Sequence, residues 1–365
     1  MFNIILLGKF IFCDILLVII NKKILKVLCM YKVAVVGVGR VASEILDILD
    51  EREFPIEEIV LIGDGEDVGK KMPYGEDLTL SIKNIEKFDF EGFDFAFFCA
   101  GTEVAKNYAE KIAQNGTIVI DCSSAFREDP QVPLVVPEVN IGELAEYRTK
   151  GIVASPNCTT VILLLALAPL HREFGAKRVV LSTYQSVSGA GSEALDELFE
   201  QTRGIYVNQP FLETKKVFTK QIAFNVIPHI DGFNEDGYTI EEKNIINETH
   251  KILDNRIAIT TTCVRVPVFI GHAMSVNIEF EKFASKEEIV ATLKDQESVG
   301  IVDFNADEGY VTPVESAGED KVFISRIRMD ETVENGVNMW VVSDNLRKGA
   351  ALNMVHIVEE IIKMR

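Results

Sequence analysis

A cysteine stands where a predicted helix begins, near the middle of the chain. Cys158 follows Pro156 and Asn157, and the apolar run 159–170 after it has the length and composition of a buried helix. The positive end of a helix dipole lowers the pKa of a thiol, and a thiolate attacks the carbonyl carbon of acyl phosphates and aldehydes. We therefore expect Cys158 to be a nucleophile, with a buried structural cysteine as the alternative.

Other polar residues could assist such a nucleophile. His272 follows Gly271 and could act as a general acid or base, although a lone histidine is more often a packed surface residue. Gln185 lies where a β-rich run meets a glycine-containing turn that could pass close to a ligand. Arg127 follows the strand predicted over 117–121, and its guanidinium could bind a phosphate group.

Residues 37–42 (GVGRVA) match the GxGxxG/A pattern of dinucleotide-binding turns, after a predicted strand and before a predicted helix. Gly37 permits the tight turn, Gly39 lets the backbone approach a pyrophosphate, and Ala42 allows close packing of helix on strand. Free N–H groups at the helix start then bind the anion. We expect a dinucleotide here; an ordinary glycine turn is the alternative.

An acidic loop follows the second predicted strand, 58–62. Asp64 and Glu66 stand roughly 20 residues after the glycine turn, where an acid hydrogen-bonds a ribose 2′-hydroxyl and repels a 2′-phosphate. This position favours NAD(H) over NADP(H). A solvated acidic loop is an equally good interpretation.

Composition limits the partners of the chain. The 365 residues carry a formal net charge of −19, which disfavours nucleic acid and anionic membranes as partners. Of the residues, 47% are apolar and 25% charged, as in folded proteins of two domains. The six cysteines form no CxxC pair and no cluster with histidine, so we expect no metal site and a reducing, cytoplasmic location.

The first 29 residues differ from the rest. The apolar run 4–20 contains Lys9 and Asp14, and neither a signal peptide nor a membrane span fits it well. We expect residues 1–29 to be an extension from an upstream mis-start, with translation beginning at Met30. A membrane anchor is the alternative.

After Met30, predicted strands alternate with predicted helices, and these elements must position the residues named above. Short β-branched or aromatic runs predict strands over 33–37, 58–62, 93–98 and 117–121, separated by helices such as 42–52. This order predicts an α/β fold with a doubly wound, dinucleotide-binding domain over 30–155.

The second half has a different pattern. Longer β-rich runs predict a mixed or antiparallel sheet with helices on one face, an α+β catalytic and dimerisation domain over 156–343. These runs are 178–184, 258–268, 274–280, 322–328 and 338–343. A last amphipathic helix, about 346–363, is expected to pack back on the first domain as segment 344–365.

Several segments in one order resemble the aspartate-semialdehyde dehydrogenase family from Met30 almost to the C-terminus. They are SSAFR (123–127), VPLVVPEVN (132–140), PNCTT (156–160), YQSVSGAG (184–191), AFNVIPHID (223–231), RVPVFIGH (265–272) and VVSDNLRKGAA (341–351). The resemblance implies reduction of L-aspartyl 4-phosphate by NADPH to L-aspartate 4-semialdehyde and phosphate, on the route to lysine, threonine, methionine and diaminopimelate. It also implies a homodimer or homotetramer.

The resemblance assigns the catalytic roles. Cys158 would form a thioester, His272 would be the general acid/base and Gln185 would orient the substrate. Arg265 would pair with the substrate α-carboxylate, and Arg127 with Asn157 would hold the phosphate. The cofactor would contact Gly37, Gly39, Ser188, Gly189, Asn345 and Gly349. Arg40 and Val41 of the glycine turn and Asp64 of the acidic loop are further cofactor-binding candidates, expected from the residues themselves.

Two features depart from the family pattern. The acidic loop at Asp64 replaces the Arg/Ser-containing loop that binds a 2′-phosphate. Asn244 stands where the family has a substrate-binding lysine, although Glu241 and the adjacent Lys243 are present as substrate-binding candidates. Two alternatives stay open: a catalytically weak or silent relative that acts as an interaction subunit, and an N-acetyl-glutamyl-phosphate reductase.

Overall fold

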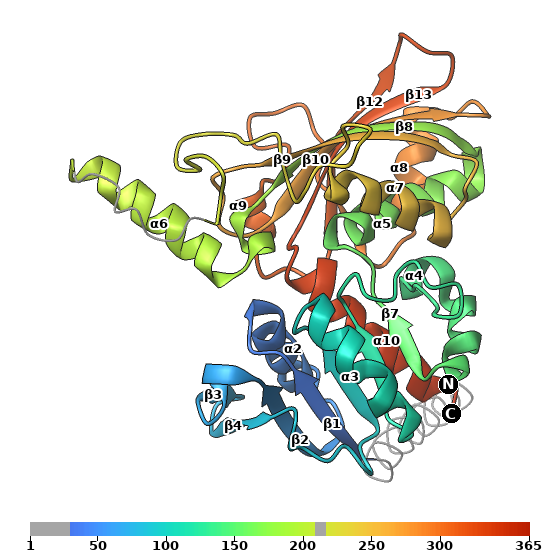
Figure 1. Cartoon of the computed structure of the whole chain (residues 1–365). Coiled ribbons are helices and arrows are strands. Elements are labelled where there is room, and N and C mark those ends of the chain that lie inside the picture. Colours follow the sequence, from blue (N-terminus) through green and yellow to red (C-terminus); the bar gives the residue numbers. More distant parts are fainter. Residues whose placement is uncertain (1–29, 209–216) are drawn as a thin grey trace, which may run out of the picture.

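The computed structural model describes residues 30–208 and 217–365, so the predicted extension 1–29 lies outside the described residues. Two sheets organise the chain, the first in the lower half of Figure 1 and the second in the upper half. The predicted α/β fold with a doubly wound sheet and a second α+β unit is confirmed. None of the described helices is both long and apolar enough to cross a membrane.

The first sheet is parallel apart from one edge strand, and its order is β3-β4-β2-β1-β5-β6-β7. β1 lies between β2 and β5, so the chain reverses its direction of travel across the sheet there, and ligands of such sheets bind at that switch point. The strands are β1 (Tyr31–Val36), β2 (Ile56–Gly63), β3 (Lys71–Tyr74), β4 (Leu78–Asn84), β5 (Phe95–Phe98), β6 (Ile118–Asp121) and β7 (Ile152–Ala154).

Helices cover both faces of this sheet because its strands are apolar on both sides. Val33 and Val35 of β1 pack with α2 (Arg40–Glu51) and α10 (Leu352–Lys363). Ala34 and Val36 pack on the opposite side with α3 (Thr102–Gln114). The edge hairpin of β3 and β4 was not predicted, although Leu78, Leu80 and Ile82 of β4 alternate with polar residues. β3 is only four residues long and contains Pro73, which weakens a strand pattern.

The second sheet is mixed, with the order β11-β12-β13-β10-β8-β9. Its helices α5 (Cys158–Phe174), α7 (Ile240–Ile252) and α8 (Lys286–Lys294) lie on one face, as predicted (Figure 1). The strands are β8 (Ala176–Gln185), β9 (Ala258–Arg265), β10 (His272–Phe280), β11 (Val299–Ile301), β12 (Val322–Asp330) and β13 (Gly336–Ser343). The predicted run 258–268 ends early as a strand at Arg265, two residues before Pro267, which cannot donate a ladder hydrogen bond.

The remaining helices complete the second unit and the connections. They are α4 (Pro137–Asn140), α5 (Cys158–Phe174), α6 (Ser192–Tyr206), α7 (Ile240–Ile252), α8 (Lys286–Lys294) and α9 (Pro313–Ser316), with 3₁₀ turns at Gly65–Asp67, Ile141–Thr149 and Val187–Ala190. The predicted last helix is split: a π-helical turn, Arg347–Ala351, precedes α10.

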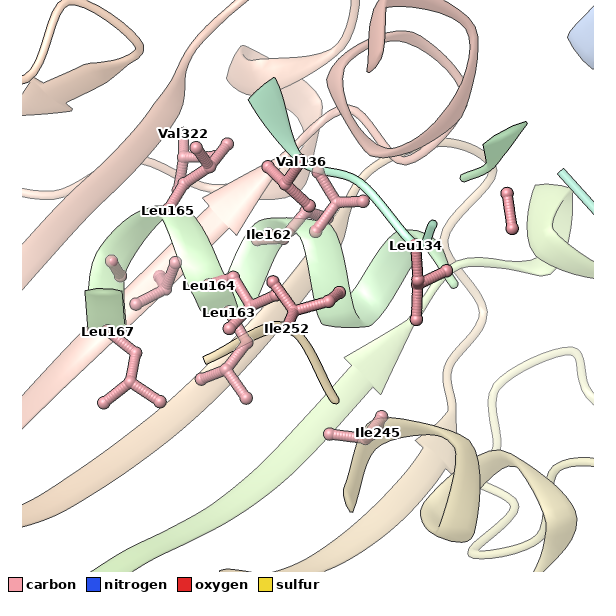
Figure 2. Close-up of a cluster of buried hydrophobic side chains, with 14 of the residues drawn as sticks. Leu134, Val136, Ile162, Leu163, Leu164, Leu165, Leu167, Ile245, Ile252 and Val322 are labelled. Carbon is pink, nitrogen blue, oxygen red and sulfur yellow. The ribbon is translucent and has the colours of Figure 1, made fainter. Parts of the chain in front are cut away.

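α5 is buried on nearly all sides. Figure 2 shows its leucines between Leu134 and Val136 of the preceding segment, Ile245 and Ile252 of α7, and Val322 of β12. A helix that is apolar around its whole circumference needs such an enclosure. The N-terminus of α5, where Cys158 lies, is therefore held by a rigid core.

Candidate active site

Cys158 is the first residue of α5, as predicted. The Asn157 side chain caps this helix by accepting a hydrogen bond from the Thr159 backbone N–H at 2.8 Å. Gly349, in the π-helical turn, lies against the cysteine: a Cβ built on Gly349 would be 2.9 Å from the Cys158 Cβ. Only glycine fits there without a shift, so the π-helical turn packs directly against Cys158.

The predicted lowering of the Cys158 pKa by the helix N-terminus is wrong for the free protein. Burial, and next the nearby Glu241 carboxylate, raise the pKa of this thiol to about 12. A hydrogen bond from Thr159 and the charges of Arg127 and Arg265 act in the opposite direction without outweighing burial. A helix end carries only a partial charge, which does not offset the desolvation of a thiolate.

Glu241 joins three elements around the cysteine. It is the second residue of α7 and is only 4% exposed. Its carboxylate accepts hydrogen bonds from Asn157 Nδ2 at 2.8 Å and from Gln185 Nε2 at 2.9 Å. Gln185 Nε2 also donates to Thr159 Oγ1 at 2.7 Å. The end of β8 and the starts of α5 and α7 are thus tied together by buried hydrogen bonds, and burial raises the pKa of Glu241.

Arg265 ends β9 directly beside Gln185, because β8 and β9 are parallel and these two residues are partners in the register. Its Nη1 donates to the Ser186 carbonyl at 2.7 Å, and the side chain is buried. Burial lowers the pKa of Arg265, opposed first by the charge of Glu241. The parallel register therefore places a cation and an amide side by side next to the cysteine.

His272 begins β10 and is 1% exposed. Its Nδ1 accepts a hydrogen bond from the Ser186 backbone N–H at 3.1 Å, while its buried Nε2 has no partner among the described residues. Burial, and next the charge of Arg265, hold the pKa of His272 well below its usual value. A Cβ at Gly189 would lie 3.0 Å from Arg265 Nη1 and 3.2 Å from His272 Nε2, so both groups meet at this glycine.

Asn345 fixes the loop that carries Ser186 and Ser188. Its Oδ1 accepts from the Gly271 N–H at 3.0 Å and from Ser186 Oγ at 3.1 Å, and its Nδ2 donates to Ser188 Oγ at 3.0 Å. Ser188, Gly189, Asn345 and Gly349 were predicted to line the cofactor. The structure gathers them around His272 and Cys158.

Arg127 lies beneath the start of α5 in a buried ion pair. Its Nη1 donates to Glu248 Oε1 at 2.9 Å, and Nε and Nη2 donate to the Ser155 and Cys122 carbonyls at 3.2 and 2.5 Å. Glu248 was not predicted as a site residue. The available signal was its spacing, two helical turns after Glu241 on the same face of α7, with a buried apolar position between them.

Lys243 was predicted to bind the substrate, but in the structure its side chain contacts other residues. Its Nζ pairs with Asp236 at 2.5 Å and lies over the Tyr238 ring at 4.4 Å. Asn244, one turn after Glu241, shares the helix face of Glu241 and Glu248 instead. The neutral Asn244 therefore adds no charge to this face of α7.

The predicted dinucleotide turn lies at the switch point of the first sheet. A cavity of about 250 Å³ is lined there by Gly37, Gly39 and Asp64, among others. Gly37 has φ +125°, and a Cβ on it would lie 2.6 Å from the Cys99 carbonyl oxygen; Gly39 has nothing within 4 Å of its Cβ position. The first glycine is required by packing, and the second leaves room for a ligand beside Arg40 and Val41 at the start of α2.

Family models match both halves of the chain. Residues 32–147 match the NAD binding domain of semialdehyde dehydrogenases, and residues 167–348 match their dimerisation domain.

Individual relatives match this chain over nearly their whole length. The chain is 48% identical over 336 residues to the aspartate-semialdehyde dehydrogenase of Rickettsia conorii and 46% identical to that of Aquifex aeolicus, covering 91% of this chain and 98% of each relative. Aspartate semialdehyde dehydrogenase II from Vibrio cholerae, solved in complex with ASA, has a TM-score of 0.89 at 40% identity, covering 92% of this chain and 99% of that one. The chain belongs to the aspartate-semialdehyde dehydrogenase family.

Proposed function

We propose that this protein reduces L-aspartyl 4-phosphate to L-aspartate 4-semialdehyde and phosphate with a nicotinamide cofactor. The proposal rests on the convergence of Cys158, Gln185, Glu241, Arg265 and His272 at the adjoining ends of α5, β8, α7, β9 and β10. The names of the relatives support this substrate pair. The product would serve amino-acid biosynthesis toward lysine, threonine, methionine and diaminopimelate.

The cofactor site fits a dinucleotide. Gly37, Gly39, Arg40 and Val41 would hold the pyrophosphate, because the open Gly39 and the N-terminus of α2 face this cavity. When bound, the reduced nicotinamide supplies a hydride. The described residues lining the cavity include the Asp64 carboxylate and no lysine or arginine, which favours NAD(H) over the NADP(H) that the family resemblance implies.

The substrate would be held by its charged ends. Arg265 is a buried guanidinium next to the cysteine, and it would pair with the α-carboxylate. Glu241 would face the ammonium group, while Gln185 would orient the chain between them. Arg127 and Asn157 would bind the phosphoryl group beside the N-terminus of α5.

In the first half of the reaction, the Cys158 sulfur bonds to the acyl carbon and the carbon–oxygen bond to phosphate breaks. The thiol proton leaves on the phosphate, so a raised thiol pKa in the free enzyme is compatible with attack. The product is a thioester on Cys158, which divides one difficult step into two easier ones.

In the second half, the reduced acyl carbon carries an oxyanion until the carbon–sulfur bond breaks. The aldehyde then leaves, and the thiol regains a proton. Because Nδ1 of the neutral His272 accepts a hydrogen bond, its proton is on Nε2. We assign to Nε2–H the donation of a hydrogen bond to the oxyanion and the transfer of a proton to the departing sulfur, while a proton from solvent restores the neutral imidazole.

We further propose a homodimer formed through the second unit, supported by the dimerisation-domain match. Phe199, Tyr206 and Phe224 are more than half exposed on α6 and its neighbouring loop, an apolar surface that a second copy could cover. The domain boundaries that we propose are those predicted: 30–155, 156–343 and 344–365. The shared packing of α2 with α10 supports the return of the last segment to the first domain.

The proposed function is tested with purified protein, L-aspartate 4-semialdehyde, inorganic phosphate and NAD⁺ or NADP⁺. Reduction of the nicotinamide should depend on phosphate and be lost in Cys158→Ala. Phosphate-dependent turnover with N-acetylglutamate semialdehyde but not with aspartate semialdehyde would instead support the reductase alternative. No turnover with either aldehyde, from a protein that still binds the cofactor, would support the silent relative.

A further inference from the structure

Glu248 bridges the cation and the nucleophile's helix in the proposed site. One carboxylate oxygen accepts from Arg127 Nη1 at 2.9 Å, and the other accepts from the Asn157 backbone N–H at 2.7 Å. The side chains of Arg127 and Glu248 are 11% and 4% exposed. A movement of the guanidinium is therefore coupled through a single carboxylate to the residue that caps α5.

α7 also fixes the backbone around this arginine. Lys251, one turn after Glu248, donates to the carbonyl oxygens of Arg127, Asp129 and Val132 at 2.7, 2.8 and 3.0 Å. Because its backbone is held in place, Arg127 can contact a ligand only if its guanidinium reorients or donates to the ligand in addition to its present partners. Of the three hydrogen bonds that this guanidinium donates, to Glu248 and to the Ser155 and Cys122 carbonyls, only the one to Glu248 has a negatively charged acceptor that an anionic ligand would compete with.

The positive charges near the cysteine already face carboxylates when no substrate is bound. The guanidinium groups of Arg127 and Arg265 interact with the buried carboxylates of Glu241 and Glu248. Asp121 and Asp231 add further negative charge that acts on Arg127 and Arg265, respectively. Asn244, on the same face of α7, adds no positive charge. Burial is the largest single effect on Arg127 and lowers its pKa, but the charge and hydrogen bond of Glu248, together with the charges of Cys122 and Glu241, outweigh burial, and the pKa of Arg127 is raised.

We infer that Glu248 is a positioning residue that holds Arg127 in the free enzyme and competes with the incoming phosphoryl group for it. The inference rests on the proposed function, in which Arg127 receives that group. A phosphate bound there is repelled by a carboxylate a few ångströms away in a poorly screened environment. The negative charge of Glu248 therefore sets the affinity for phosphate below what the guanidinium alone would give.

The test uses Glu248→Gln, which keeps the shape and one acceptor oxygen but removes the charge. Glu248→Asp keeps the charge. Glu242→Gln is the matched control, because Glu242 is a buried glutamate of the same helix whose partners are Thr239 and Cys263, and glutamine preserves its capping role. The probe is inorganic phosphate, measured by its protection of Cys158 against iodoacetamide, with the labelled peptide quantified by mass spectrometry.

The phosphate concentration for half-protection should fall about tenfold in Glu248→Gln and stay near the wild-type value in the other two variants. The KM for phosphate should fall in parallel, with the KM for the aldehyde unchanged within about twofold. An unchanged or higher half-protection concentration in a folded Glu248→Gln protein would overturn the inference, as would an absence of protection in every variant. Protection needs no turnover, so a wild-type protein that is protected but inactive would refute the proposed function and leave this inference testable.

Discussion

The backbone N–H of Ser186 donates a hydrogen bond to Nδ1 of His272 at 3.1 Å, which assigns the imidazole proton to Nε2. Nε2 is buried, lies beside Gly189 and has no partner among the described residues. A buried donor without a partner is costly, so it fits a group that binds a substrate oxygen. The carbonyl oxygen of the reacting acyl group is the partner that we assign to it.

Replacement of His272 by glutamine should lower kcat by about 10² to 10⁴, the usual contribution of a positioned proton donor. The wild-type pH profile should also lack an acidic limb near the ordinary histidine pKa. Burial and then Arg265 lower that pKa, so the imidazole becomes protonated only at a pH well below its usual range. Steady-state kinetics from about pH 5.5 to pH 9 measure both effects. An acidic limb near pH 6.5 that vanishes in His272→Gln would contradict the assignment.

Alkylation of Cys158 in the free enzyme should accelerate about tenfold per pH unit between about pH 7 and pH 10, without a plateau. The reason is the thiol pKa of about 12, set first by burial and then by Glu241. Glu241→Gln removes the second cause and should speed alkylation about threefold at a fixed pH, whereas Glu242→Gln should not. A plateau below pH 9 in the wild type would show that the thiol is activated before the substrate binds.

Gly349→Ala should reduce kcat about 10- to 100-fold while the protein stays folded. The added Cβ would lie 2.9 Å from the Cys158 Cβ, so the cysteine or the π-helical turn must shift. Gly142→Ala is the control, since nothing lies within 4 Å of its Cβ position. Circular dichroism and kcat measured together separate displacement of the nucleophile from unfolding. Wild-type kcat in Gly349→Ala would mean that this contact has no bearing on the reaction.

Asp64→Ser should raise kcat/KM for NADP(H) about tenfold or more and lower it for NAD(H). The substitution removes a carboxylate that lines the cofactor cavity and would repel a 2′-phosphate. The exposed Asp77, in the turn between β3 and β4, provides a control as Asp77→Ser. If the ratio of kcat/KM for NADP(H) to kcat/KM for NAD(H) were the same in Asp64→Ser and the wild type, this acid would not select between the two cofactors.

Patterns among residues that are neighbours in the sequence were enough to predict the dinucleotide turn and the helix that begins at Cys158. A strand followed by a glycine turn and a helix predicted the cradle at Gly37, and an apolar run after Asn157 predicted that a helix begins at Cys158. Both depend on residues that are neighbours in the sequence. The same holds for the parallel strands themselves, whose short apolar runs are typical of a sheet covered on both faces.

The contacts between distant segments could not be predicted in this way. Gln185 and Arg265 meet because β8 and β9 are parallel in one register, which residue patterns alone do not determine. Glu248 looks like a solvated residue of an amphipathic helix until Arg127 is found against it. The thiol pKa was mispredicted for the same reason: the helix end is a local effect, whereas burial and Glu241 are tertiary ones.

The covalent intermediate on Cys158 is tested most directly by trapping it. Enzyme mixed with L-aspartate 4-semialdehyde and oxidised nicotinamide, without phosphate, is quenched in acid, digested and examined by mass spectrometry. We predict an aspartyl thioester on the peptide that contains Cys158, which disappears when phosphate is added before the quench. Steady turnover with no acyl group on that peptide, or near wild-type turnover in Cys158→Ala, would contradict the account.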